Sequence, residues 1–414
     1  MHIDLLIEHA AQLVTCASDK PKRGAAMDDV GMIEDGAVAV HKGMIVDVGS
    51  TRELQSRYDA TITMAVRGKV VCPGFVDAHT HIVYAGDRAA EFEMRIRGAT
   101  YMEIMEAGGG ILSTMRQVRA ASVEQLVEAT RGRLDAMLKL GTTTVEIKTG
   151  YGLDADSELK MLHAIALLDT IHPIDIIPTF LGAHAIPPEY EGHAEDYTQH
   201  VIEMMIPMAA EWYRASHFAT RNIPFFIDVF CEQNAFSLDQ AQRVLEAGVA
   251  HGMQVKAHVD EFVNLGGAKM AVDLGAVSID HLDVTHADEF LHLAQSDTVS
   301  VVIPAVNFNF GSTHFADALR MIDAGVALAL ATDYNPGSAP CPSMPLVMAI
   351  ACRYQRLLPS EALNASTINA AYAVRMGERL GSIQIGKQAD LLIVNAPDYR
   401  HLAYQFGGNL VEQV

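Results

Sequence analysis

The middle of the chain alternates short apolar runs with longer amphipathic stretches. Eight apolar runs have the length and composition of buried strands, at residues 75–79, 143–148, 175–181, 225–230, 254–258, 277–281, 299–304 and 327–332. Amphipathic stretches such as 122–140, 238–248 and 313–325 lie between them. Because strands that alternate with helices form parallel βα units, the pattern predicts an α/β fold, a (β/α)8 TIM-like barrel with its active site at the carboxyl ends of the strands.

Both ends of the chain show a β-rich pattern instead. Short strands are expected at 3–7, 36–40 and 44–49, and a turn at 386–390 leads into another strand at 391–394. We therefore predict a small β-sandwich domain built from both chain ends, residues 1–73 and 377–414, with the barrel at 74–376.

Two connections are longer than barrel closure requires, residues 83–113 and 182–219. Long loops on the active face of a barrel commonly carry substrate contacts, so we expect both to reach the site. The run of three glycines at 108–110 is not followed by Gly-Lys-Ser/Thr, which favours a flexible turn over a phosphate-binding loop.

Composition narrows the class of protein. With 414 residues, of which 50% are hydrophobic and 20% charged, the chain can bury a large core. A formal net charge of -21 disfavours nucleic acid and anionic membrane surfaces as partners. The five cysteines lack C-x-x-C spacing, which favours reduced thiols, and no signal segment or bilayer-spanning stretch is evident. We expect a soluble cytoplasmic protein.

His79 and His81 flank a threonine at the end of the first expected strand. Residues i and i+2 of a strand project from the same face, so both rings can bind one metal ion, although this spacing alone also occurs in ordinary surface histidines. His258 and Asp333 follow two other expected strands. Together the four would make a three-nitrogen, one-carboxylate site that leaves a position for water on a divalent metal.

Three residues at or just after the ends of expected strands are candidates for proton transfer. Glu261, three residues after His258, can carry protons to a leaving nitrogen; alternatively it is a helix-start glutamate. His281 can orient the water or polarise a carbonyl; alternatively its ring forms a hydrogen bond with Asp283. Asp333 would share the proton transfer. Lys148 also ends an expected strand, and we assign it no catalytic role.

The fourth expected strand and the residues that follow it, Phe225 to Glu232, contain no lysine. Binuclear hydrolases of this design commonly use a modified lysine there to bridge two metals. One metal ion is therefore predicted.

The segment from Pro73 to His81, together with His258, His281 and Asp333, resembles the amidohydrolase superfamily over nearly the whole chain. That resemblance implies a metal-dependent hydrolase with zinc or iron as its divalent metal. A bound metal lowers the pKa of its water and supplies hydroxide as nucleophile.

A narrower resemblance rests on the segments at 79–88, 101–104, 107–111, 148–153, 180–184 and 332–338. They are similar to the branch of the superfamily that hydrolyses the cyclic amide of 4-imidazolone-5-propanoate to N-formimidoyl-L-glutamate in histidine degradation. We then expect metal-bound hydroxide to attack the ring carbonyl, and the resemblance suggests a homodimer. It also implies that Arg88 pairs with the propionate carboxylate and that the pocket is lined by Tyr101, Tyr151, His184, Glu261, Asn335, Gly337 and Ser338.

Two alternatives remain at this point. Another mononuclear amidohydrolase, such as a guanine or cytosine deaminase, would share the metal ligands and the glutamate after His258. Arg88 with Tyr151 and Asn335 favours the imidazolone that bears a carboxylate. A non-catalytic scaffold of the same fold would be expected to have lost metal ligands, yet all four are present.

Overall fold

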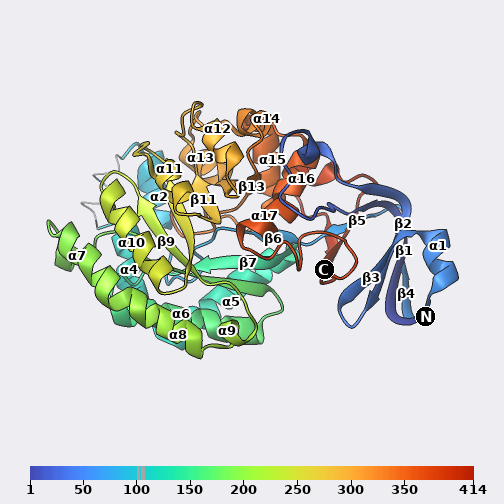
Figure 1. Cartoon of the computed structure of the whole chain (residues 1–414), viewed down its shortest axis with the longest axis horizontal. Coiled ribbons are helices and arrows are strands. Elements are labelled where there is room, and N and C mark those ends of the chain that lie inside the picture. Colours follow the sequence, from blue (N-terminus) through green and yellow to red (C-terminus); the bar gives the residue numbers. More distant parts are fainter. Residues whose placement is uncertain (100–102, 104–107) are drawn as a thin grey trace.

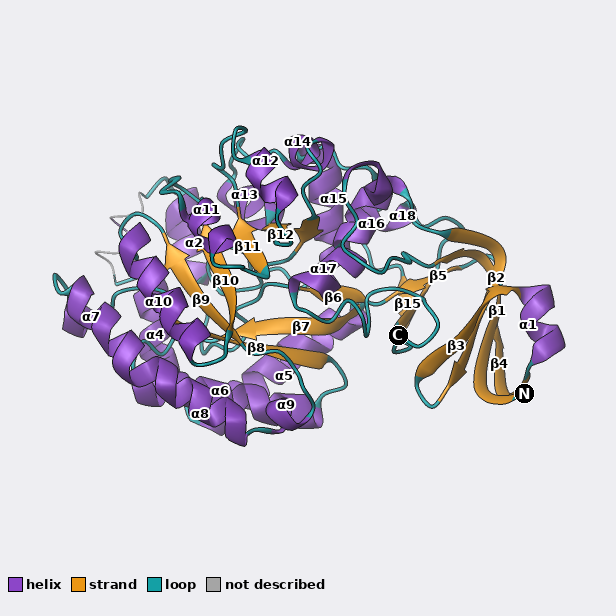
Figure 2. Cartoon of the chain, viewed as in Figure 1, coloured by secondary structure: helices purple, strands orange, loops and turns teal. Residues whose placement is uncertain are grey.

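The computed structural model describes residues 1–99, 103 and 108–414. Within these residues an eight-stranded parallel sheet forms the centre of the larger part of the molecule (Figures 1 and 2). Its strands are hydrogen-bonded in chain order: β6 (Phe75–Asp77), β7 (Thr142–Lys148), β8 (Asp175–Ala183), β9 (Phe226–Cys231), β10 (Gln254–Val259), β11 (Ser278–His281), β12 (Val299–Val302) and β13 (Leu328–Leu330). The expected barrel is confirmed, with shifts of a few residues at strand ends.

Helices cover the outside of this sheet (Figure 2). Two of them begin as their sequences predict, because Ser122 and Ser237 form capping boxes with the glutamines three residues later. The helices after the first barrel strand are α2 (Ala89–Ile96), α4 (Ile111–Ala120), α5 (Val123–Lys139), α6 (Ala155–Ile171), α7 (Ala194–His200), α8 (Ile206–Ala215), α9 (His217–Thr220), α10 (Leu238–Ala250), α11 (Gly267–Asp273), α12 (Phe290–Gln295), α13 (Pro304–Phe310), α14 (Ala318–Asp323), α15 (Met344–Tyr354), α16 (Pro359–Ala365) and α17 (Ile368–Ala373).

Several elements differ from the sequence expectation by more than a strand end. The strand expected to reach residue 304 ends at Val302, because Pro304 lacks an N–H and begins α13. The helix expected at 313–325 is only α14. The long connection at 182–219 is mostly helical, with a 3-10 turn at Pro188–Tyr190, then α7, a π-helical turn at Val201–Met205, α8 and α9. The described part of 83–113 likewise contains α2 and the start of α4.

The two edge strands of the sheet are joined just beyond β6 and β13. The N–H of Asp333 donates to the carbonyl of His79, and the N–H of His81 donates to the carbonyl of Tyr334, both at 3.0 Å. We call this junction between the first and last strands the seam. One buried carboxylate stabilises it: Asp77 accepts the backbone N–H of Thr332 at 3.1 Å and its hydroxyl at 2.6 Å. Closing the barrel therefore places His79 and His81 beside Asp333.

Both chain ends contribute to a second, mixed sheet (Figure 1). Its path runs β15 (Val411–Gln413), β14 (Leu391–Val394), β5 (Val70–Pro73), β1 (His2–Val14), β2 (Met32–His41) and β3 (Met44–Ser50), while β4 (Asp59–Ala65) also pairs with β1. The helical segments of this part are a 3-10 turn at Gly24–Asp28, α1 (Thr51–Arg57) and α18 (His401–Tyr404). The C-terminal β14 pairs with β5, which leads into the first barrel strand, so the β unit lies directly beside the barrel. The domain limits at 73 and 377 stay predictions.

None of the helices in the described residues has the length and apolar character needed to cross a membrane. The five cysteines are unpaired, as their spacing indicated.

We predict that Asp77→Ala lowers the free energy of unfolding by about 1–3 kcal/mol, because it leaves the buried N–H and hydroxyl of Thr332 without their acceptor. Denaturation of the metal-free protein measures the loss. The exposed Asp288→Ala serves as the control. A stability equal to that of the control would show that this carboxylate does not hold the seam.

Candidate active site

Four side chains converge at the carboxyl end of the barrel. His79 and His81 follow β6, His258 lies on β10 and Asp333 follows β13. The Nε2 atom of His81 lies 3.2 Å from the Nε2 atoms of both His79 and His258. Asp333 Oδ1 lies 3.5 Å from Nε2 of His79 and of His81. All four residues are at most 3% exposed, so nearly all of their surface is buried.

Carboxylates behind the cluster fix two of the rings. His79 Nδ1 lies 2.7 Å from Asp280 Oδ2, and His258 Nδ1 lies 3.1 Å from Asp228 Oδ1. Because a carboxylate accepts, each ring donates through Nδ1 and presents a lone pair at Nε2. Burial, with nearby positive charge, lowers the pKa of His79 well below its usual value, which keeps the ring neutral.

This arrangement fits a metal ion. His81 Nε2 can donate a hydrogen bond to only one of its two neighbours, so lone pairs would face each other without a cation between them. A tetrahedral ion with nitrogen ligands at about 2.0–2.1 Å holds those nitrogens roughly 3.3 Å apart. Asp333 Oδ1 is buried and has no hydrogen-bond partner among the described residues, as a free fourth ligand atom would. The geometry also groups His281 with His79 and His258 as a possible ligand set.

Glu261 and His281 lie next to the cluster and line the same cavity. Glu261 Oε2 is 3.8 Å from His281 Nε2. Burial, reinforced by Asp333, raises the pKa of Glu261 well above its usual value, and burial raises the pKa of Asp333 to about 7. The Asp333 carboxyl can therefore exchange a proton near neutral pH, while the surroundings of Glu261 favour its protonated form.

The two structural alternatives for these residues are wrong. The helix after β10 is α11, which begins at Gly267, so Glu261 is not a helix-start residue. Asp283 Oδ1 instead accepts the backbone N–H of Ala316, and His281 Nδ1 is buried without a hydrogen-bond partner in the described part of the chain. His281 also has a φ of 86°, in the left-handed region that a non-glycine residue rarely adopts. Such strain commonly marks functional positions.

A cavity of about 650 Å³ opens from the cluster. Its walls include seven of the residues expected to bind substrate: Arg88, Tyr151, His184, Glu261, Asn335, Gly337 and Ser338. Tyr101 lies outside the described residues. The size suits a small organic ligand.

Arg88 reaches this cavity with part of its guanidinium free. Its Nε donates to Thr114 Oγ1 at 2.9 Å, whereas Nη2 is buried and has no hydrogen-bond partner among the described residues. A Cβ atom at position 337 would come within 2.3 Å of Arg88 Nη1, so any other residue there would require the arginine to shift from this position. Among the described residues, this buried donor thus lacks an acceptor.

The turn after Asp333 is held by Asn335. Its amide nitrogen donates to the Asp333 carbonyl and to Ser338 Oγ, each at 2.7 Å, and its oxygen accepts the N–H groups of Gly337 and Ser338. The amide is fully used within the turn, so Asn335 shapes the wall rather than offering a free donor.

His184 contributes an oriented ring to the wall of the cavity. Its Nδ1 lies 2.8 Å from the carbonyl oxygen of Gly150, and the ring stacks on His81 with centroids 5.0 Å apart. Burial lowers the pKa of His184 to about 3, so the ring is neutral.

Sequence reasoning missed the residues that stand behind the metal ligands. Asp228 and Asp280 orient two histidines, and Lys148 lies 2.7 Å from Asp228. The available signal was a charged residue inside several of the apolar runs, as in Phe225-Phe226-Ile227-Asp228-Val229. Fully buried charges require partners, so such residues indicate a polar network beneath the site.

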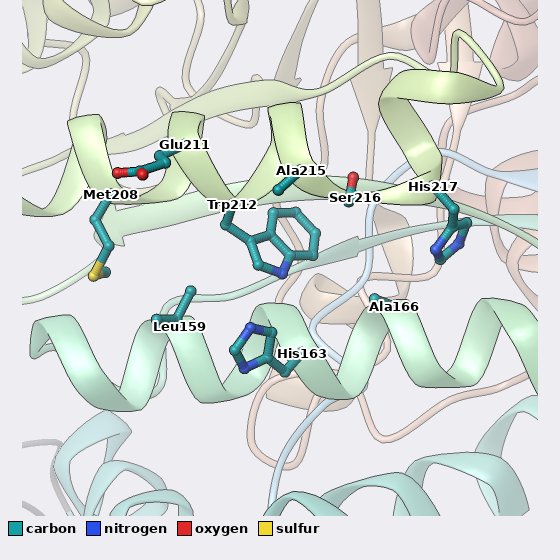
Figure 3. Close-up of a pocket in the computed structure, with 9 residues that line it drawn as sticks. All are labelled: Leu159, His163, Ala166, Met208, Glu211, Trp212, Ala215, Ser216 and His217. Atoms are coloured by element: carbon teal, nitrogen blue, oxygen red, sulfur yellow. The ribbon is translucent and has the colours of Figure 1, made fainter.

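A second hollow, of about 560 Å³, lies outside the barrel between α6 and α8 (Figure 3). Trp212 and His163 point into it from the two helices, and the other lining residues include Leu159 and Met208. None of the expected metal, catalytic or substrate residues lines it.

Comparison with known proteins agrees with this geometry. A model of the amidohydrolase family matches residues 70–413. An imidazolonepropionase of Chloroflexus aggregans is 58% identical over 99% of this chain and 96% of its own, and one of Herpetosiphon aurantiacus is 51% identical over 99% and 95%.

Solved structures show the same fold at low identity. An adenosine deaminase from Xanthomonas campestris with bound zinc superposes with a TM-score of 0.67 at 21% identity, covering 100% of this chain and 88% of its own. A guanine deaminase of E. coli gives 0.70 at 16% identity, covering 98% and 92%.

The chain therefore belongs to the amidohydrolase family and, within it, to the imidazolonepropionases. The family and the histidine-rich cluster together indicate a divalent metal as cofactor.

We predict one tightly bound divalent metal per chain, held through His79, His81, His258 and Asp333. Elemental analysis of the purified protein should give a ratio near one, and His79→Ala should lose the metal because it removes a central ligand. His163→Ala, which alters a histidine of the outer hollow, should keep it. Two metals per active chain would contradict the assignment.

Proposed function

We propose that the chain hydrolyses the cyclic amide of 4-imidazolone-5-propanoate to N-formimidoyl-L-glutamate, a step of histidine degradation. The observation that carries this proposal is the buried Nη2 of Arg88, which has no hydrogen-bond partner in the described part of the chain and belongs to a residue that lines the same cavity as the metal cluster. A guanidinium binds a carboxylate through parallel hydrogen bonds, so it suits the propionate of this substrate.

Arg88 and the metal cluster both line the cavity, and an aromatic side chain lies between them. Tyr151 lies between Arg88 and the metal ligands: its ring centroid is 6.0 Å from Arg88 Cζ and 5.8 Å from the His81 ring. A substrate whose carboxylate meets Arg88 can therefore lay its ring along Tyr151 and His184. That orientation directs the ring carbonyl toward the metal cluster.

When bound, a divalent metal lowers the pKa of a coordinated water so that hydroxide is available near neutral pH. In our proposal the carboxylate of Asp333, with a pKa raised to about 7, accepts the proton that the attacking water gives up. His281, whose Nδ1 has no hydrogen-bond partner among the described residues, orients the carbonyl being attacked. Glu261, kept protonated by its raised pKa, donates to the ring nitrogen as the C–N bond breaks.

The alternative of a guanine- or cytosine-type deaminase is not favoured. The deaminases with this fold are 16% and 21% identical to the chain, whereas the imidazolonepropionases are 58% and 51% identical over nearly its full length. A purine or pyrimidine base also carries no carboxylate to pair with Arg88.

Further parts of the proposal follow the family resemblance. The metal is zinc or iron, since histidine and carboxylate ligands accommodate both. The protein is proposed to be a cytoplasmic homodimer. Its strong negative charge supports a small-molecule partner rather than nucleic acid or a membrane surface.

The proposed reaction is tested by incubating metal-loaded protein with 4-imidazolone-5-propanoate. N-formimidoyl-L-glutamate should accumulate without release of ammonia. Ammonia release from guanine or cytosine, with no turnover of the imidazolone, would support the deaminase instead.

Arg88→Met should weaken productive substrate binding by about 2–5 kcal/mol, because it removes the partner of a buried carboxylate. Metal content should stay unchanged. Arg97→Met is a matched control, since Arg97 is exposed at the end of the same helix and pairs with Glu93. An unchanged Michaelis constant and turnover in Arg88→Met would refute the carboxylate assignment.

Glu261→Gln should lower turnover by about 10²–10⁴-fold, because glutamine keeps the shape of the side chain but cannot transfer a proton. Metal content and melting temperature should match those of the wild type and of the exposed control Glu246→Gln. Near-normal turnover with intact metal would exclude the proton-transfer role.

A further inference from the structure

Lys148 is a fully buried lysine at the end of β7, directly beneath the metal cluster. Its Nζ lies 2.7 Å from Glu146 Oε1 and 2.7 Å from Asp228 Oδ2. A third carboxylate oxygen, Asp280 Oδ2, lies 3.6 Å away. The mechanism above makes no use of this ammonium group.

Two of the three carboxylates are those that orient metal-binding histidines. Asp228 accepts from Lys148 at Oδ2 and faces His258 Nδ1 with Oδ1. Asp280 Oδ2 faces both His79 Nδ1, at 2.7 Å, and Lys148. A single ammonium group thus connects the carboxylates behind ligands that come from opposite sides of the cluster, β6 and β10.

The other buried lysine of this region is placed differently. Lys256 Nζ donates to the carbonyl oxygens of Ala78 and Ala373, at 3.0 and 3.4 Å, and lies 3.8 Å from Asp280. No contact between Lys256 and Asp228 occurs among the ion pairs of the described residues. Only Lys148 therefore contacts both carboxylates.

Lys148 also compensates the negative charge of the buried carboxylates. Glu146, Asp228 and Asp280 place three carboxylates against the ammonium groups of Lys148 and Lys256, which leaves one net negative charge. Ionised Asp333 adds another, and a divalent cation would balance the two. Removing Lys148 leaves carboxylates buried without compensation, which is costly inside a protein.

We propose that Lys148 is a positioning residue that holds Asp228 and Asp280 where each accepts the Nδ1 proton of a metal-binding histidine, so that both Nε2 lone pairs point at the ion. The inference rests on the metal site of the proposed function. Although burial alone lowers the pKa of Lys148, Asp228, Glu146 and Asp280 raise it above its usual value, which keeps the ammonium charged.

Lys148→Met tests this role, because methionine fills much of the same space without the charge. Apoprotein titrated with Co²⁺, and with Zn²⁺ in competition with a chelator, gives the metal affinity. Loss of a residue that orients metal ligands typically weakens binding about 10–100-fold, and we expect a loss of that size. The visible spectrum of the Co²⁺ protein should change as well, because the histidines no longer hold the same geometry.

Lys256→Met is the matched control, since it removes a lysine that is equally buried but does not touch Asp228. Its melting temperature should fall, yet its metal affinity and Co²⁺ spectrum should change much less than those of Lys148→Met. Equal losses of affinity in the two variants would overturn the proposal, because any buried charge would then have the same effect.

A second variant covers the case in which Lys148→Met does not fold. Lys148→Met with Glu146→Gln removes one charge of each sign and so leaves the net charge of the cluster unaltered. The proposal predicts weakened metal binding here too, and wild-type affinity with a wild-type Co²⁺ spectrum would overturn it. A wild-type protein that binds no Co²⁺ or Zn²⁺ would instead refute the metal site and with it the proposed function.

Discussion

The buried imidazoles of His79 and His258 are each forced, by a carboxylate at Nδ1, to present a lone pair toward His81. Three ring nitrogens then meet an oxygen of Asp333 that has no hydrogen-bond partner among the described residues, in a buried cluster that borders the cavity. Lone pairs at such distances repel one another unless a cation lies between them. The carboxyls that we propose transfer protons line the cavity beside this cluster.

The barrel makes that convergence possible through the seam between its first and last strands. His79 and Asp333 share a backbone hydrogen bond there, and Asp77 fixes the neighbouring Thr332. The ligands are thus held by backbone geometry as well as by side chains, which limits the reorganisation needed when a metal binds. Arg88 stands at the other end of the cavity, packed on a glycine that leaves it room.

Much of this architecture was predictable from the order of apolar and polar residues. The eight strands and the C-terminal strand at Leu391–Val394 follow directly from apolar runs with turn residues beside them. The segment that contains α7 and α8 was expected to be a long loop, because it is longer than barrel closure requires. In the structure its helices adjoin a π-helical turn, which departs from a regular helical period. Tertiary contacts, rather than local pattern, decide such elements.

Within the site, the sequence predicted the residues expected to contact the metal and the substrate, but not the residues behind them. Histidine and aspartate at strand ends indicate metal ligands, since parallel strands bring their carboxyl ends together. The roles of Asp228, Asp280 and Lys148 depend on which buried side chains meet across the barrel, and no local pattern contains that information. Arg88 stood out through its family resemblance, whereas its free Nη2 appears only in three dimensions.

X-ray absorption at the metal edge tests the central claim most directly. The site described above predicts one shell of nitrogen and oxygen ligands at about 2.0–2.1 Å, with three imidazoles contributing, no sulfur ligand and no second metal nearby. A metal–metal distance of about 3.5–4 Å, the separation in two-metal sites, would contradict the single-ion account. So would a shell with fewer than three imidazoles, since the lone-pair geometry of the cluster would then not be what binds the ion.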